Sequence, residues 1–425
     1  MILLYLLPFL TALNGINMKM AGLNIRTDQL FVVLLIIIIL SAILLGKIRF
    51  YLDKAGRLLL LFFLWSFVVS LFFSPDSKYS IIQTINLLSS ASVYFVLTNL
   101  LRPIKFINKY FKCFLLAGIF ATSYGILIFV LSLMGLNIYG VNLSDDFSVA
   151  YGVFATMREP NVFGSFSLLY FILSSVIIVS LPRSKRKYDN LIFFLLLTSC
   201  FSVFLSFTRG VWFAACIGII VTLTFNKRLF KFFSQKIKFV FSMGSLLVAI
   251  FIIANLFIST SIFYYKLSHF LDFKGGTGAH RMEIWKNALD SIQKSPILGH
   301  GTYSYATLFS PTLPGPGDQK SVAWIGNFLL ILLHDTGIIG TILFLWVIKV
   351  LLKEGIKTTK KLRHTDPMNA AISYGLCLSL MCMLIAFFFT TAFSFVYAWS
   401  ILGLISVYVR YGKKLERQNA SVKNF

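Results

Sequence analysis

Long apolar segments alternate with short polar connections along most of the chain. Apolar runs long enough to cross ~30 Å of hydrocarbon occur at residues 2–16, 30–46, 58–73, 81–99, 111–136, 163–181, 190–206, 211–225, 238–258, 326–347, 369–389 and 392–409. The first run is short, but it lacks the basic flank and cleavage site of a signal peptide, so we expect it to be retained. The pattern predicts an all-α polytopic membrane protein with about twelve transmembrane helices.

The longest polar insertion, residues 259–325, divides the chain into two groups of spans. We expect transmembrane helices 1–9 in residues 1–258, an extracytoplasmic loop at 259–325, and transmembrane helices 10–12 in residues 326–409. The polar and basic residues 410–425 predict a disordered cytoplasmic tail that touches anionic lipid. The loop is the expected place for chemistry, because almost all of the remaining chain is typical of membrane-spanning helix.

Within this loop, residues 279–294 have the pattern of an amphipathic helix that ends before Pro296 and Gly299. One arc, at about 100° per residue, carries its apolar side chains: Met282, Ile284, Trp285, Ala288, Leu289 and Ile292. Arg281 breaks the pattern, because it points along the middle of this arc. A cation on the buried side is costly unless an anion meets it. Arg281 is therefore a candidate anion-binding residue.

Composition and charge distribution narrow the class of protein. Of the 425 residues, 58% are hydrophobic and only 13% charged, which excludes a soluble globular or disordered chain. The net charge of +24 would suggest nucleic acid in a soluble protein. Here 28 of the 39 Lys and Arg residues lie in alternate connections: 47–57, 100–110, 182–189, 226–237, 348–368 and 410–425, with Lys112 and Lys238 at their edges. By the positive-inside rule these connections and both termini are cytoplasmic, and no nucleic-acid partner is expected.

Other arginines on the predicted outer side are further candidates for anion binding. Arg26 is interpreted as a solvated loop residue and set aside. Arg209 is either an interfacial anchor for lipid phosphate or a substrate ligand, and Arg158 is either an ion-pair partner of Glu159 or a substrate ligand. Together with Arg281 they predict a positively charged outer cavity. A planar guanidinium suits bidentate phosphate binding, so a lipid-linked pyrophosphate is the natural ligand.

Two histidines are further candidates. On the tenth predicted span, Asn327 and His334 share a face about 10 Å apart along the axis. If Trp324 marks the outer interface, His334 lies about 15 Å deep, where its pairing with Asp335 indicates either a buried proton-coupled role or a packing pair. His300 is on the outer side and has a suitable ordinary pKa for a general base, although a solvated loop histidine would look the same.

Neither a nucleotide-binding loop nor a metal centre is predicted. The glycine cluster at 275–278 has no strand before it and no Lys-Ser/Thr after it, so it is not a phosphate-binding P-loop. The five cysteines lie within apolar runs and lack metal-ligand spacing. We expect them to be small core residues, with no cofactor, no metal ligand and no disulfide among them.

Four short motifs stand at outer ends of the predicted spans. They are Arg158-Glu-Pro-Asn161; Arg209 after Ser206 and Thr208; Arg281-Met-Glu-Ile-Trp285 with Pro296-Ile-Leu-Gly299-His-Gly301; and Asn327 with Gly337 and Gly340. In this order and spacing the chain resembles the O-antigen ligase and polymerase superfamily of bacterial envelope glycan assembly. The resemblance covers most of the chain and is sharpest from Thr198 to Leu345.

The resemblance implies a metal-independent membrane glycosyltransferase of the bacterial plasma membrane. Such an enzyme moves a glycan from undecaprenyl diphosphate onto an acceptor hydroxyl at the outer face. Arg209 and Arg281 would hold the donor diphosphate with Arg158 as a third cation, and Glu159 or His300 would serve as base. The supporting residues would be Asn327, Trp285, His334 and Asp335. Partners would be the lipid-linked oligosaccharide, membrane lipids and a chain-length regulator protein.

One departure from the family pattern bears on the reaction. Ligases of this superfamily carry a histidine immediately before the asparagine that here is Asn327, and this chain has Gly326 there. The difference favours a polymerase, which extends one lipid-linked chain with the repeat unit of another. A ligase that transfers glycan to a lipid or protein acceptor is the alternative. A transporter of lipid-linked sugar is third, because it should show matched halves and several midplane charges.

Overall fold

The chain folds into a mainly helical bundle, seen here in a computed structural model that describes residues 2–15, 17–20, 23–136, 138–142, 152–224, 276–309 and 324–423. Two short antiparallel strand pairs, β1 (Asn17–Met20) with β2 (Leu23–Arg26) and β3 (Val141–Asn142) with β4 (Gly152–Val153), lie between helices. The helices are α1 (Ile2–Ala12), α2 (Thr27–Leu44), α3 (Lys54–Phe72), α4 (Ser77–Ala91), α5 (Val93–Leu100), α6 (Ile104–Leu133), α7 (Pro160–Ser180), η1 (Arg183–Lys185), α8 (Asp189–Leu205), α9 (Arg209–Thr224), α12 (Gly276–Lys294), α13 (Ser304–Phe309), α14 (Phe328–Thr365), α15 (Pro367–Phe387), η2 (Ala392–Ser394) and α16 (Val396–Lys423).

The apolar runs of the sequence coincide with these helices, apart from 238–258, which lies outside the described residues. Within the described ranges, seven helices are long and apolar enough to cross a membrane: α2, α3, α4 joined to α5, α6, α7, α14 and α15. The apolar helices α1, α8 and α9 are shorter. The protein is thus an all-α polytopic membrane protein, and the count of twelve spans stays a prediction.

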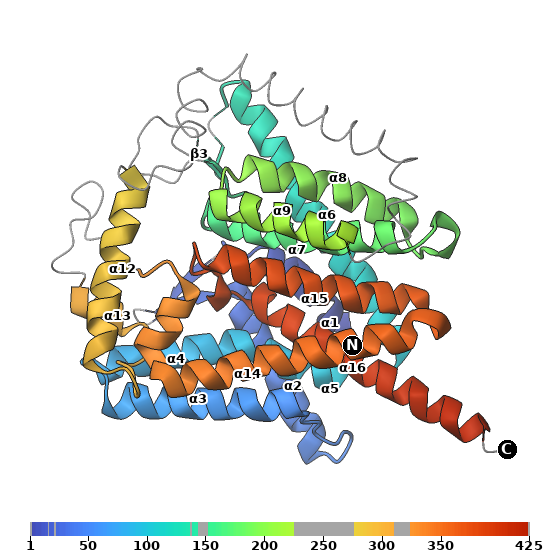
Figure 1. Cartoon of the computed structure of the whole chain (residues 1–425), viewed down its shortest axis with the longest axis horizontal. Helices are drawn as coiled ribbons and strands as arrows, with labels where there is room; N and C mark the ends of the chain where they lie inside the picture. The colour runs from blue at the N-terminus through green and yellow to red at the C-terminus, as the bar shows by residue number, and fades with distance from the viewer. Residues whose placement is uncertain are drawn as a thin grey trace.

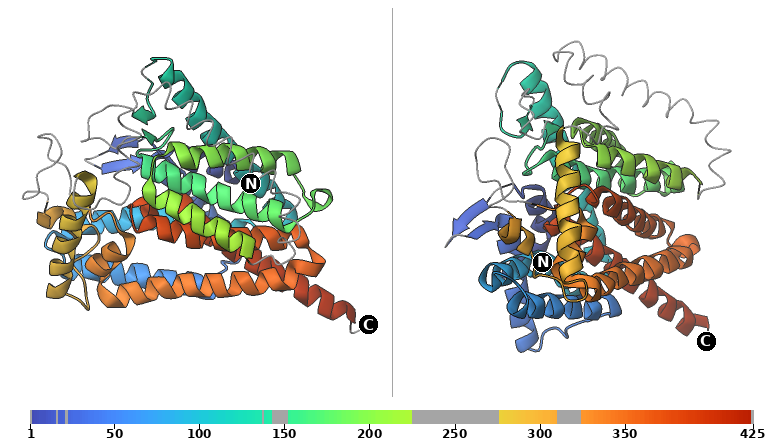
Figure 2. Two further views of the ribbon diagram at one scale, coloured as in Figure 1. Left: turned by 45° about the horizontal axis from the view of Figure 1, so that its top comes forward. Right: turned by 60° about the vertical axis from the view of Figure 1, so that its left-hand side comes forward.

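The connections gather at two opposite ends of the bundle, with the C-terminus at one end and α12 and α13 at the other (Figures 1 and 2). At the C-terminal end the Tyr94 hydroxyl donates to Asp53 over 2.6 Å. At the other end Arg26 donates to the carbonyl oxygen of Ser394 over 3.0 Å. Connections divided between two ends are expected when successive connections lie alternately on the inner and the outer side of a membrane.

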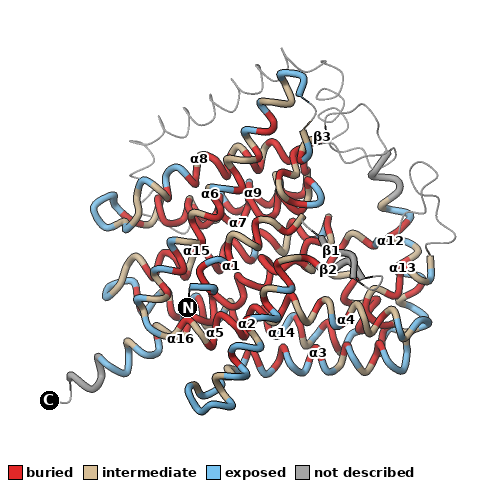
Figure 3. The backbone as a smooth tube through the Cα atoms, turned by 180° about the vertical axis from the view of Figure 1, so that it is seen from behind, coloured by how far each residue is buried: buried red, intermediate tan, exposed pale blue. Residues whose placement is uncertain are grey.

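The helices differ in how far the bundle buries them, as the backbone coloured by burial shows (Figure 3). In α7, 89% of the most apolar window is buried, against 28% in α2. Helix α2 therefore lies at the periphery, where its exposed apolar side chains suit lipid. Helix α7 is central, so the residue before it, Glu159, is placed near the middle of the bundle end.

The C-terminal tail departs from the prediction of disorder for residues 410–425. Helix α16 continues to Lys423, so that prediction is wrong for 410–423. Part of the reason is that this tail packs beside the end of α14. Glu416 accepts from Lys361 over 2.6 Å, and Lys413 donates to Glu354 over 2.8 Å.

Helix α14 is interrupted at Gly337, where φ is +61° and ψ is −169°. The backbone groups freed by this break find partners in the loop that follows α12. The amide of Ile338 donates to the carbonyl of Pro296 over 2.9 Å, and the amide of Gly301 donates to the carbonyl of Asp335 over 2.9 Å. Irregular backbone in a membrane protein needs such internal partners. The predicted continuous span 326–347 is therefore two helical pieces, of which only the second is straight and long.

Candidate active site

Helix α12 covers the predicted amphipathic helix 279–294 and runs across the end of the bundle, over the ends of α3 and α14 (Figures 1 and 2). Its apolar face packs against α13 and the start of α14. The small core between them consists of Ile284, Ala288, Tyr305, Ile325 and Ile331. The Tyr305 hydroxyl also donates to the carbonyl oxygen of Ile284 over 3.2 Å. The helix is thus held by protein contacts along one side.

The buried stripe of α12 is narrower than the predicted apolar arc. Met282 is 50% exposed and Leu289 is 48% exposed, so protein covers only part of these two side chains. The reason is that protein meets only one side of the helix, at Ile284 and Ala288. Arg281 lies one turn before Ile284 on that same stripe, as predicted, and it is half-buried.

A chain of contacts brings the Arg281 turn to the start of α9. The Trp285 indole donates to the carbonyl oxygen of Ile325 over 3.0 Å, and its ring lies 6.5 Å from that of Phe389 between centroids. The Phe389 ring in turn lies against Gly210, where a Cβ would come 2.5 Å from it. Gly210 directly follows Arg209, so Arg281 and Arg209 approach each other.

The short link between α8 and α9 places Arg209 and connects it to α7. Phe207 adopts a φ of +50° in this link, and the Thr208 hydroxyl donates to the carbonyl of Ser206 over 3.1 Å. Gly152 packs so closely here that a Cβ would come 2.6 Å from the carbonyl oxygen of Ser206 and 3.3 Å from Pro160. The start of α7 therefore lies beside the start of α9.

Glu159 lies among these arginines, directly before α7. Its side chain is exposed by accessible surface, yet the surrounding protein removes enough of its hydration to raise the pKa of its carboxyl, and the charges of Arg158 and Arg281 offset part of this rise. Burial also lowers the pKa of Arg281, and Arg209 lowers it further while Glu159 opposes the change. An arginine stays charged despite such a shift. The structure thus brings together Arg158, Glu159, Arg209 and Arg281, which the sequence had singled out separately.

Arg26, which the sequence analysis set aside as a solvated loop residue, is buried, with 8% of its surface exposed. Its guanidinium donates to Asp28 over 3.2 Å and to the Ser90 hydroxyl over 2.8 Å, and it lies 4.6 Å from the centre of the Phe395 ring. The solvated interpretation was wrong because the chain before α2 folds back onto the bundle. Arg26 also lowers the pKa of Arg158, after the larger effect of burial, so it contributes to the same positive field.

The two histidines lie apart from the arginines. Ser291 follows Arg281 by ten residues, or about 15 Å along α12, and the His300 Nε2–H donates to the Ser291 carbonyl over 2.8 Å. The rings of His300 and His334 are 4.9 Å apart. Burial lowers the pKa of His300, its bond to Ser291 raises it, and His334 lowers it. His300 is therefore not brought to the arginine cluster.

A buried hydrogen-bonded chain joins the end of α12 to the break in α14. The His334 Nδ1–H donates to Asp335 over 3.0 Å, and His334 Nε2 then accepts from the Ser291 hydroxyl over 3.2 Å. The same Asp335 carboxylate accepts from the amide of Tyr303 over 2.7 Å. The order Ser291, His334, Asp335 is that of a nucleophilic triad. Ser291 is only 4% exposed, however, so these hydrogen bonds serve to hold the end of α12 against α14.

The depth of His334, about 15 Å below the outer interface, stays a prediction, and the structure gives its neighbours. Its carbonyl accepts from the amide of His300 over 2.8 Å. The neighbouring Gly301 lies against Ser74, in the connection between α3 and α4 at the bundle end. The first piece of α14 therefore packs against the loop that follows α12, and the Thr336 carbonyl at its end accepts from the Trp65 indole of α3 over 2.9 Å. Ser291 was not among the predicted site residues; its signal in the sequence is a polar residue on the stripe of Ile284 and Ala288.

Asn327 caps the first piece of α14. Its side-chain oxygen accepts from the amides of Leu329 and Leu330 over 3.0 and 3.2 Å. Gly326, directly before it, has a φ of +62°, and a Cβ there would meet only the Trp324 carbonyl oxygen, at 4.0 Å. Among the residues that the structure describes, nothing would obstruct a Cβ at position 326.

Comparison with known proteins gives a family for this part of the chain. Residues 192–345 match the family described as O-antigen ligase. No curated protein matches the chain. The matched segment runs from α8 into α14 and contains Arg209, Arg281, Trp285 and Asn327. The match confirms the resemblance to the O-antigen ligase and polymerase superfamily, and with the apolar helices it indicates a bacterial membrane protein of ligase or polymerase type.

Proposed function

We propose that the protein is a polysaccharide polymerase that joins undecaprenyl-diphosphate-linked repeat units of an O-antigen, capsule or exopolysaccharide. The observation that carries the proposal is the approach of three segments far apart in sequence: Arg158 and Arg281 lie within electrostatic reach of Glu159, and Arg209 lies within reach of Arg281. The basic connections that the structure describes lie at the opposite end of the bundle. By the positive-inside rule the arginine cluster then faces outward and both termini face the cytoplasm.

The arginines suit a reaction in which a diphosphate leaves. Arg209 and Arg281 hold the donor diphosphate through paired N–H donors. The acceptor hydroxyl attacks the anomeric carbon of the donor glycan, and the bond from that carbon to the phosphate oxygen breaks. Undecaprenyl diphosphate departs with the electron pair, and the positive field stabilises its growing charge. The reaction requires no oxidant or reductant.

The hydroxyl proton requires an acceptor, and Glu159 is the group we assign. Its carboxylate lies within electrostatic reach of Arg158 and Arg281, and its pKa is raised above that of an ordinary glutamate. A base works best when its pKa approaches the working pH. His300 was the other candidate, but it is bonded to Ser291, about 15 Å along α12 from Arg281.

Two other functions, a ligase and a transporter, are alternatives to the polymerase. A ligase would transfer the glycan to a lipid or protein acceptor, and Gly326 in place of the family histidine disfavours it. A transporter of lipid-linked sugar would need charged groups near the bilayer midplane. The His334–Asp335 pair lies at the bundle end, beside His300 and Gly301, so it no longer supplies that feature.

Reconstitution tests the proposal. The purified protein is placed in vesicles with a defined undecaprenyl-diphosphate-linked repeat unit, and products are separated by chain length. Formation of lipid-linked dimers and longer chains supports a polymerase. Transfer only to an added lipid or protein acceptor would establish a ligase, and movement of substrate across the bilayer without a new glycosidic bond would establish a transporter. Adding a co-purified chain-length regulator should then alter the length distribution only.

A further inference from the structure

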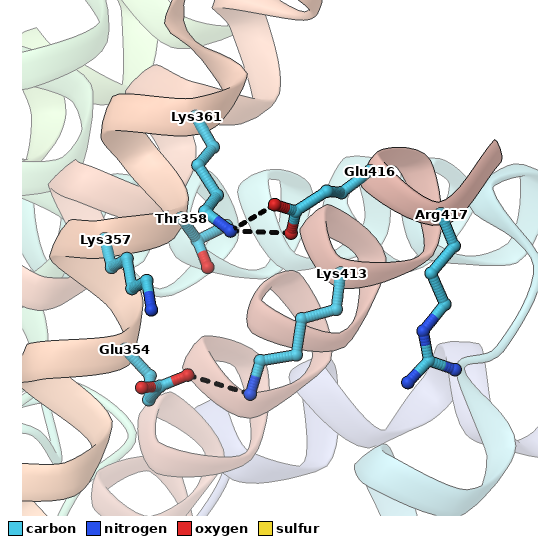
Figure 4. Close-up of a pocket in the computed structure, with 7 residues that line it drawn as sticks. All are labelled: Glu354, Lys357, Thr358, Lys361, Lys413, Glu416 and Arg417. Carbon is cyan, nitrogen blue, oxygen red and sulfur yellow. Dashed lines mark hydrogen bonds and ion pairs between the residues drawn. The ribbon is translucent and has the colours of Figure 1, made fainter. Parts of the chain in front are cut away.

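A cavity lies at the end of the bundle opposite the arginine cluster, between α14 and α16. It has a volume of about 360 Å³ and is lined by Glu354, Lys357, Thr358, Lys361, Lys413, Glu416 and Arg417 (Figure 4). The segment matched to the ligase family, 192–345, contains none of these residues. The cavity is therefore separate from the proposed reaction site.

The close crossing of the two helices explains where the cavity forms. Gly412 lets α16 approach α14 so closely that a Cβ would come 2.6 Å from the Thr358 methyl carbon. Long charged side chains surround this contact, and two ion pairs bridge the helices, Lys361 to Glu416 and Lys413 to Glu354 (Figure 4). The two helices thus touch through small residues, and long charged side chains surround this contact.

The wall carries an excess of positive charge. Four cations line the cavity against two carboxylates, which leaves a net charge of +2. Each carboxylate is already engaged by a lysine, and the hydrogen bond from Lys361 lowers the pKa of Glu416, so it stays ionised near neutral pH. Lys357 and Arg417 form no ion pair with any residue that the structure describes. These two cations are the ones open to a ligand.

The position of the cavity along α14 indicates which part of the membrane faces its positive charge. The straight part of α14 begins at Ile338, at the end that carries the arginine cluster. At 1.5 Å per residue, Glu354 lies about 24 Å and Lys361 about 35 Å further along. A hydrocarbon core is about 30 Å thick. The cavity therefore lies at the level of the headgroups in the opposite leaflet.

We propose that this cavity binds the phosphate of an anionic phospholipid headgroup, with Lys357 and Arg417 as its principal ligands. An arginine offers paired N–H donors to phosphate oxygens, and a lysine adds a compact charge. Thr358 lines the cavity between these cations, so a bound phosphate would lie between two helices that the lipid then holds together. The proposal does not depend on the reaction at the other end of the bundle.

The test uses the full-length protein in a neutral detergent. Short-chain phosphatidylglycerol, short-chain phosphatidylcholine and inorganic phosphate are titrated separately, and each dissociation constant is taken from the rise in thermal unfolding temperature. Phosphatidylglycerol should bind, and the double variant Lys357→Gln/Arg417→Gln should bind it about 30-fold more weakly, at about 1 kcal/mol for each cation. The matched control Lys47→Gln/Arg49→Gln removes the same charge from another connection at this end of the bundle and should bind as the parent does.

The separate titrations distinguish a lipid headgroup from soluble phosphate as the ligand of the cavity. Binding of phosphatidylglycerol but not inorganic phosphate assigns the site to lipid, and equal binding of inorganic phosphate assigns it to soluble phosphate. Unchanged phosphatidylglycerol affinity in the double variant, or an equal loss in the control, would overturn the proposal. If the double variant fails to fold, Arg417→Gln alone, at an exposed position, should weaken binding about fivefold, and no change would count equally against the site.

Discussion

Trp285 and Phe389 pack ring against ring, with their centroids 6.5 Å apart. Phe389 also lies against Gly210, so a single aromatic side chain separates α12 from the start of α9. Arg281 and Arg209 belong to the neighbouring turns of these two helices. Packing between the helices therefore brings the two arginines near each other.

Removing either arginine should reduce polymer synthesis strongly. We expect Arg209→Gln and Arg281→Gln each to lower turnover about 10²-fold or more, because each removes a donor aimed at the charge of the leaving diphosphate. Chain-length analysis of cell-surface glycan and turnover in vesicles measure this. Lys286→Gln removes a cation from the exposed face of α12 and should leave both unchanged. Normal chain length in the Arg209/Arg281 double variant would refute the assigned role.

Glu159 should determine the acidic limb of the pH profile. Its carboxylate must be ionised to accept a proton, and its pKa lies above that of an ordinary glutamate because burial disfavours the charge. Removing the nearby cation in Arg158→Gln takes away a stabilising charge, so the pKa should rise further and the limb should move to higher pH. The measurement is kcat/KM against pH for the parent and the variant. A limb that moves to lower pH, or a fully active Glu159→Gln, would contradict the assignment.

Loss of the hydrogen bonds between Ser291, His334 and Asp335 should lower the stability of the protein before it affects turnover. Ser291→Ala removes one bond to His334, and we expect a loss of about 1 kcal/mol in the free energy of unfolding. Asp335→Asn weakens the acceptor for both His334 and Tyr303, and we expect about 2 kcal/mol. Thermal unfolding in detergent measures both. If Ser291 were a nucleophile, Ser291→Ala would abolish turnover while leaving stability unchanged.

His300 should make the outer loop sensitive to acid. Its pKa in the folded protein is lowered, chiefly by burial, so the unfolded chain takes up a proton first, below about pH 6.5. Stability is thus fully present above that pH and falls as pH decreases toward the folded pKa. We expect a smaller drop in unfolding temperature between pH 7.5 and 5.5 for His300→Gln than for the parent. An equal drop in both would show that other groups account for it.

Gly326 and Gly337 offer a matched pair of substitutions. Both have a φ near +60°, at +62° and +61°, which strains an alanine backbone, and at Gly337 the ψ of −169° adds to the strain because that region is essentially restricted to glycine. At Gly326 the new Cβ meets only an oxygen 4.0 Å away, whereas at Gly337 it overlaps the carbonyl of Ile297. Gly326→Ala should fold and retain activity, and Gly337→Ala should lose about 3 kcal/mol or more. Purified yield and unfolding temperature compare them, and equal stability would contradict the described break.

The sequence predicted most helices because apolar runs of span length leave few other structures in a membrane. It also predicted the orientation of Arg281, since one helix face can be read from spacing alone. It could not predict the burial of Arg26, which depends on Ser90 and on Ser394, 368 residues away. Nor could spacing reveal that Ser291 meets His334, because that contact requires α14 to break at Gly337.

The break at Gly337 has a consequence for how the protein is made. The amide of Ile338 is satisfied by Pro296, and the carbonyl of Asp335 by Gly301, so these segments complete each other's backbone bonding. Residues 296–301 are synthesised before Ile338, so neither segment can complete its backbone bonding until the other has been made. The broken helix and the loop before it should therefore fold together, in one cooperative step.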